Sequence, residues 1–182
     1  QADTLNAYFT ATRSSLGGLV YPGFAVSDLS TSATGRLAGG GADLWSTGLV
    51  PPASFTAPEP WGNAGFGPSP IGYQFADHIV QSIITRDPKY NLRDYPVSQD
   101  GTIDEETLAT FDERTGAGAA SDPHGYRRFI QRGRKLIIYH GYSDPALTPF
   151  RTIGLYDQLA TAAGGYDKLQ RSVRLFMVPG MQ

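Results

Sequence analysis

Apolar positions near the C-terminal end of the chain indicate two buried strands with a helix between them. Residues 135–139 and 173–178 are short, almost continuous apolar runs, typical of strands that are covered on both faces. Residues 150–163 have helical spacing and stop at Gly164-Gly165. A strand, a helix and a second strand in this order predict a βαβ unit with parallel strands and a right-handed crossover. The predicted fold class is therefore α/β.

The rest of the chain is predicted to contain short helices and a long irregular region. Helices are expected at residues 2–11, 76–86, 102–118 and 122–133, and a short strand at Val20-Tyr21 within the segment 16–24. Asp104 and Asp122 are the expected N-caps of the last two helices, because an aspartate at this position accepts from the free amides of the first turn. Acidic residues after Asp104 suit the positive end of a helix dipole.

Residues 45–72 form a stretch rich in proline and glycine with four large aromatic side chains. These are Trp45, Phe55, Trp61 and Phe66. Long loops of this kind are often lids or binding loops. The rings could anchor the loop in a core or line a pocket for an aromatic ligand, and Arg36 could pair with an acidic group of such a ligand. A binding module for phenolic or carbohydrate ligands that uses this loop is therefore one candidate function.

Composition excludes several other classes. The 182 residues are 40% hydrophobic and 18% charged, which is typical of a globular protein. The net charge is −2 with no basic block, so we expect no binding to nucleic acid or to an anionic membrane. No apolar run approaches the roughly 20 residues of a membrane-spanning helix. Cysteine is absent, so thiol catalysis, disulfides within this chain and cysteine-zinc sites are excluded.

The turn after the first strand carries the strongest candidate chemistry. Residues 140–145 read His-Gly-Tyr-Ser-Asp-Pro and follow the carboxyl end of a strand, where sites of open α/β sheets lie. In α/β-hydrolases an acid after one strand and a histidine after the next follow the order Ser…Asp…His. A βαβ unit places two such loops side by side. Asp144 is therefore the candidate catalytic acid, and Gly141 is expected to permit a tight turn.

Other polar residues have less support. His140 is the alternative base, but it lies in the same turn as the acid, and a strand-end imidazole bonded to the backbone is the simpler interpretation. Ser143 lacks the surrounding elbow of a nucleophile. His78 is interpreted as an ordinary surface or packing histidine, and His124 has no partner at metal spacing. Four acids lack the alternating spacing of a calcium loop and are interpreted as solvated residues at or before a helix start; they are Asp100, Asp104, Glu105 and Glu106.

Two segments closely resemble the tannase / feruloyl esterase family. They are "GRKLIIYHGYSDPALTPFRTIGLYDQL" and "VRLFMVPGMQ". The family carries G-K-L-x-x-Y-H-G-x-x-D-P and, after the next strand, R-L-F-x-V-P-G-M-x-H-C. The resemblance makes Asp144 the triad acid. The family's histidine comes two positions after the methionine, one position beyond Gln182, and no G-x-S-x-G nucleophile motif is present.

The resemblance implies that the chain is an internal fragment of an α/β-hydrolase. Residues 1–72 would be part of the lid domain, 73–132 a helical return, and 133–182 the late part of the catalytic domain. The whole protein would be a secreted serine carboxylic-ester hydrolase for feruloyl- or galloyl-type aromatic esters, with the remaining N-terminal part of the same protein as partner. A peptidase or lactonase with the same Asp144 role is the other hydrolase option.

The resemblance also predicts which cofactors the chain binds and whether the chain alone is active. No cofactor or metal is expected in this chain. The resemblance allows calcium in the lid domain of the whole protein and implies cysteines beside its serine and histidine. Because serine and histidine lie outside residues 1–182, we expect this chain alone to be inactive.

Overall fold

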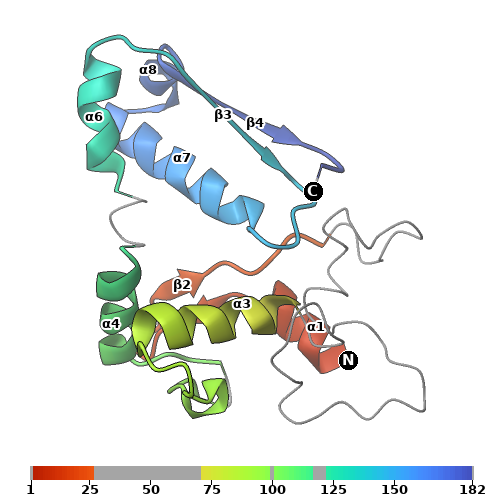
Figure 1. The fold of residues 1–182 in the computed structure, drawn as a ribbon. Coiled ribbons are helices and arrows are strands. Elements are labelled where there is room, and N and C mark those ends of the chain that lie inside the picture. The colour runs from red at the N-terminus through yellow and green to blue at the C-terminus, as the bar shows by residue number, and fades with distance from the viewer. Residues whose placement is uncertain (1, 27–70, 99–100, 117–121, 182) are drawn as a thin grey trace.

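Two parallel strands with a helix along one face form the C-terminal part of the molecule (Figure 1). The computed structural model describes residues 2–26, 71–98, 101–116 and 122–181. The strands are β3 (Leu136–Gly141) and β4 (Val173–Val178), and the connection contains α7 (Pro149–Ala163) and the short α8 (Tyr166–Leu169). Thr148 caps α7, and Gly164 ends it with φ 81°, so the predicted βαβ unit is confirmed.

The strand register is continuous over six residue pairs, from Leu136↔Val173 to Gly141↔Val178. The second strand has the predicted bounds. The first extends two residues further than predicted, because His140 and Gly141 pair with Met177 and Val178 instead of entering the turn.

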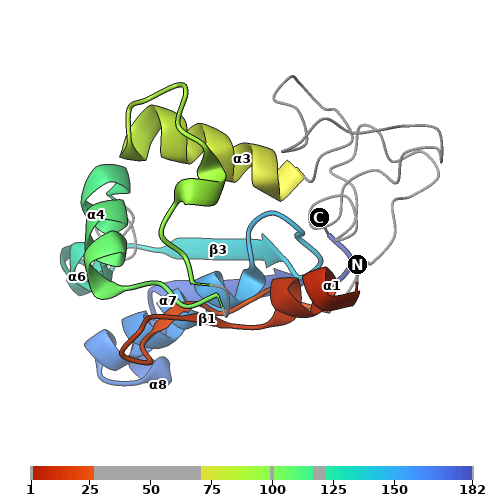
Figure 2. The same cartoon turned by 90° about the horizontal axis from the view of Figure 1, so that it is seen from below.

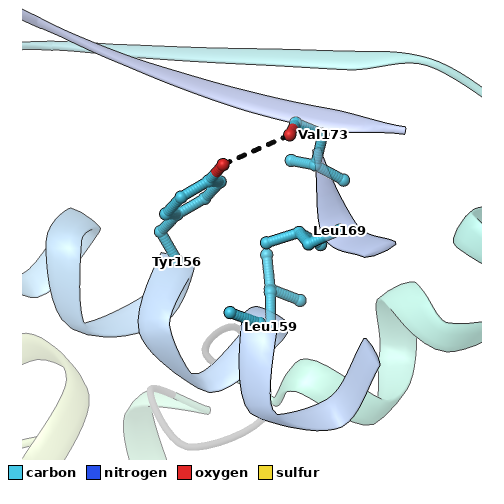
Figure 3. Packing of buried hydrophobic residues seen from close by; sticks show 5 residues of the cluster. Tyr156, Leu159, Leu169 and Val173 are labelled. Carbon is cyan, nitrogen blue, oxygen red and sulfur yellow. Dashed lines mark hydrogen bonds between the residues drawn. The ribbon is translucent and has the colours of Figure 1, made fainter. Parts of the chain in front are cut away.

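The core lies between α7 and the near face of the strand pair. Leu159, Leu169 and Val173 are fully buried there, and the Tyr156 hydroxyl donates to the Val173 carbonyl at 3.3 Å (Figure 3). Helix α6 (Pro123–Gln131) packs against α7 and begins at the predicted cap Asp122. Apolar burial on this side therefore fixes the position of both strands.

The other face of the strand pair is exposed. Ile137, Tyr139 and Phe176 retain 68%, 69% and 54% of their accessible surface. The apolar runs predict cover on both faces, but within the described residues a single crossover helix covers only one. The prediction of two-sided cover is therefore not met by the described part of this chain.

The described N-terminal elements lie on the side of α7 that faces away from the strands (Figures 1 and 2). Helix α1 (Ala2–Phe9) is followed by a hairpin of β1 (Thr12–Arg13) and β2 (Leu19–Tyr21). The helix and β2 confirm the predictions, whereas β1 was not predicted because two residues carry no periodic pattern.

Three further helical segments complete the described chain. Helix α3 (Ile71–Ile79) continues into the π-helical turn η1 (Val80–Ile84), followed by the 3₁₀ turn η2 (Leu92–Asp94) and α4 (Glu105–Thr115). Helix α3 begins earlier than predicted. Helix α4 starts at the predicted cap, Asp104. None of the helices in the described ranges has the length and apolarity needed to cross a membrane.

Candidate functional site

The two loops that leave the carboxyl ends of β3 and β4 contact each other directly. The amide of Tyr142 donates to the Val178 carbonyl at 2.9 Å, and the amide of Ser143 donates to the Met181 carbonyl at 3.1 Å. The chain after β4 therefore lies against the turn that carries Asp144. This is the neighbouring arrangement that the βαβ pattern predicts.

Gly141 makes this contact sterically feasible. A Cβ atom at this position would lie 2.8 Å from the carbonyl carbon of Met181 and closer still to its oxygen. Gly141 lies in β3 and has no positive φ, so the prediction that a tight turn requires the glycine is wrong. The glycine is needed because the backbone of the neighbouring loop approaches it closely.

The carboxylate of Asp144 is held through one of its two oxygens. Oδ1 accepts from the amides of Ala146 at 2.8 Å and Leu147 at 2.9 Å, which closes an Asx-type turn. Oδ2 lies 3.5 Å from Nε2 of His140 and, among the described residues, accepts no hydrogen bond. The side chain is 21% exposed. One oxygen is thus fixed by the backbone, and the other can accept from an imidazole.

His140 connects the turn to α7 through its two ring nitrogens. Nε2 lies 2.9 Å from the Leu147 carbonyl, and Nδ1 lies 2.6 Å from the Thr152 hydroxyl on α7. Because a carbonyl oxygen can only accept, Nε2 carries a proton, and both ring nitrogens are engaged by the protein. A general base needs a free lone pair facing substrate. The arrangement therefore favours the interpretation of His140 as a strand-end imidazole and not as the base.

The acidic cluster includes a helix cap. Asp104 accepts from the amide of Thr107 at 2.9 Å and from its hydroxyl at 2.6 Å, and these bonds lower the pKa of the Asp104 carboxyl. Within the described ranges, no group of three or more potential ligands is arranged to hold a metal ion.

The remaining sequence candidates in the described part of the chain lie on other elements, apart from Ser143, which belongs to the Asp144 turn. His78 lies in α3, and His124 lies in the first turn of α6, where its amide bonds to the Asp122 cap. Ser143 is buried beside Asp144, and its amide is used by Met181. The other candidates lie outside the described residues; they are Arg36, Trp45, Phe55, Trp61, Phe66 and Asp100.

One side of the Asp144 turn is held by residues near the N-terminus, which no sequence pattern predicts. The hydroxyl of Tyr8 donates to the Pro145 carbonyl, and the buried Thr148 hydroxyl donates to the Gly23 carbonyl. These partners are 137 and 125 residues apart in the sequence. No motif or spacing in a single sequence connects residues at such separations, so only the folded chain could show these contacts.

A family model described as tannase and feruloyl esterase matches residues 2–182. An uncharacterized esterase of Agrobacterium fabrum is 25% identical over 103 residues, covering 57% of this chain and 18% of the relative. The mono(2-hydroxyethyl) terephthalate hydrolase of Piscinibacter sakaiensis is 43% identical over 53 residues, covering 29% of this chain and 8% of that enzyme.

Two solved structures from Aspergillus oryzae share the fold. Feruloyl esterase B superposes with a TM-score of 0.61 at 16% identity, and a second esterase with 0.60 at 15%. Each match covers 98% of this chain but only 28% of the solved chain. The chain thus shares the fold of these esterases and spans less than a third of their length.

Proposed function

The chain belongs to the tannase and feruloyl esterase family, and on this premise we propose that it is part of a serine carboxylic-ester hydrolase whose triad acid is Asp144. The observation that carries the proposal is the contact between the chain after β4 and the Asp144 turn. A histidine two positions after Met181 would directly follow the segment that contacts the Asp144 turn. The family pattern places its base at that point.

The reaction is acyl transfer in two steps. A serine supplied by the rest of the protein attacks the ester carbonyl, and the histidine takes the serine proton and returns it to the leaving alcohol. Water then attacks the acyl-enzyme by the same proton route and releases the acid. Asp144 orients the imidazole and stabilises its protonated form, and this role needs a carboxylate with one oxygen fixed and the other free.

The proposed substrates are esters of aromatic acids of the feruloyl or galloyl type. Two of the similar proteins have names that include a substrate, and both names contain an aromatic acid, ferulate or terephthalate. The acyl pocket would be formed with the aromatic loop of residues 45–72, which lies outside the described residues. We also propose that the protein is secreted, on the family resemblance.

The proposed partner is the remaining N-terminal part of the same protein, which would carry the serine and cover the open face of the strand pair. Ile137, Tyr139 and Phe176 form an apolar surface on that face. Strands exposed on one face and along their edges seldom form a stable sheet by themselves. In this proposal residues 1–72 are lid, 73–132 return the chain, and 133–182 complete the catalytic domain, so the isolated chain is inactive.

The experiment expresses the complete reading frame that contains this chain and follows hydrolysis of methyl ferulate. Asp144→Asn keeps an oxygen that accepts from the two turn amides but removes the charge. We expect kcat to fall about 10⁴-fold, as when a triad acid is lost. Asp112→Asn, on the exposed surface of α4, should be unchanged. Wild-type kcat in Asp144→Asn would overturn the assignment.

A further inference from the structure

We propose that Tyr8 is a positioning residue for the triad acid: it fixes the peptide unit that holds the Asp144 carboxylate. The inference rests on the proposed function, because it concerns how Asp144 is presented to its histidine. The hydroxyl of Tyr8 donates to the carbonyl of Pro145, the residue directly after the acid. Tyr8 contributes this bond from α1, an element far from the acid in the sequence.

A single peptide plane links this bond to the carboxylate. The Pro145 carbonyl and the Ala146 amide belong to the same planar unit, and in a trans peptide they point in opposite directions. The carbonyl receives the Tyr8 hydroxyl, while the amide donates to Oδ1 of Asp144 at 2.8 Å. Hydrogen bonds in such a chain orient and polarise one another. Tyr8 therefore acts on the carboxylate without touching it.

The ring of Tyr8 is itself held firmly. It stacks on Phe24 with a centroid distance of 4.1 Å and an interplanar angle of 2°, and the amide of Phe24 donates to the Tyr8 carbonyl at 3.3 Å. Gly23 has φ 75°, and a Cβ there would lie 2.5 Å from the Phe9 carbonyl oxygen. The chain thus folds back closely over the end of α1, which limits the movement of the phenol.

Neighbouring contacts hold the far end of the turn in the same way. Thr148 donates its hydroxyl to the Gly23 carbonyl and its amide to the Tyr21 hydroxyl at 3.3 Å. Arg151 reaches the Val20 carbonyl at 3.4 Å. Of these residues, Tyr8 bonds to the Asx turn itself, because its partner Pro145 lies between Asp144 and the amide donor Ala146.

The phenol remains a donor at the pH of ester hydrolysis. Burial raises the pKa of Tyr8, and the nearby Tyr21 and the negative charge of Asp144 raise it further. Burial likewise raises the pKa of Tyr21. Both hydroxyls therefore stay neutral, and neither places a second negative charge beside the acid.

The test compares Tyr8→Phe, Tyr166→Phe and Asp144→Asn in the complete reading frame, with methyl ferulate as substrate. Tyr166 is a matched control, because its hydroxyl donates to Asp157 at 2.6 Å on the surface at the far end of α7. Loss of one orienting hydrogen bond should lower kcat about tenfold in Tyr8→Phe, with KM changed less than about twofold. The control should match wild type.

A pH profile separates positioning from mere stability. A well-placed carboxylate raises the pKa of the triad histidine, so Tyr8→Phe should shift the acidic midpoint of kcat/KM to lower pH. A lower melting temperature with unchanged kcat and midpoint would overturn the inference. If Tyr8→Phe does not fold, Phe24→Leu, which keeps the hydroxyl but loosens its ring, must show the same shift.

The three variants also distinguish a failure of the triad assignment from a failure of the role of Tyr8. Activity retained in Asp144→Asn would refute the triad assignment itself. Activity lost in Asp144→Asn but unaffected in Tyr8→Phe would refute only the role of Tyr8.

Discussion

Replacement of Gly141 by alanine tests the contact on which the site depends. The added Cβ would lie 2.8 Å from the Met181 carbonyl carbon, whereas nonbonded carbon atoms need about 3.5 Å. The chain after β4 must therefore retreat by roughly 1 Å, because the other side of Gly141 is fixed by the strand ladder. A shift of that size weakens the bond from Ser143 to Met181 and would move the proposed base away from Asp144.

Two measurements follow on the complete reading frame. Overpacking should cost about 1–3 kcal/mol of unfolding free energy, and misplacement of the base by about 1 Å should lower kcat up to 10²-fold. Gly154→Ala is the control: it lies within α7, nothing stands within 4 Å of its added Cβ, and a helical alanine should stabilise by about 0.5–1 kcal/mol. Wild-type kcat and unfolding free energy in Gly141→Ala would refute the reasoning.

Two further predictions concern the scaffold. Leu159→Ala removes a fully buried side chain from the core and should cost about 2–5 kcal/mol in urea unfolding, while Leu16→Ala, at an 84% exposed position, should stay within about 0.5 kcal/mol. Asp104 has a lowered pKa in the folded chain, so its cap stabilises above the ordinary carboxyl pKa and is lost as the pH falls through the lower folded value. Thr107→Val should raise that pKa toward its ordinary value in an NMR titration, and an unchanged pKa would contradict the role of the hydroxyl.

Local patterns predicted the elements that bear the site. The apolar run of β4, the helical spacing of α7 and the Gly164-Gly165 stop carry their information within a few residues, so their bounds matched closely. Asp104 and Asp122 were recognisable because a cap depends only on the next three residues. The position of Asp144 after a parallel strand followed from the same local information and the topology of the βαβ unit.

What escaped prediction depends on contacts between distant segments. The extension of β3 through His140 and Gly141 is set by its partner strand, and the role of Gly141 by the backbone of Met181. The bond from Tyr8 to Pro145 joins segments 137 residues apart. Such contacts arise from tertiary packing, which leaves no regular spacing in one sequence.

The equal length and unbroken register of β3 and β4 have a consequence for how this fold can vary. Both strands end at the same level, so the Asp144 turn and the chain after β4 meet at the carboxyl ends of the strands. Helix α8 and the Gly164-Gly165 turn lie at the opposite ends. Insertions at the Gly164-Gly165 turn, before the buried Leu169, would alter the length of the crossover but leave the ladder from Leu136↔Val173 onward intact. An insertion within either strand would instead slide one loop past the other. Changes in chain length are therefore tolerated at the Gly164-Gly165 turn and not within the strands.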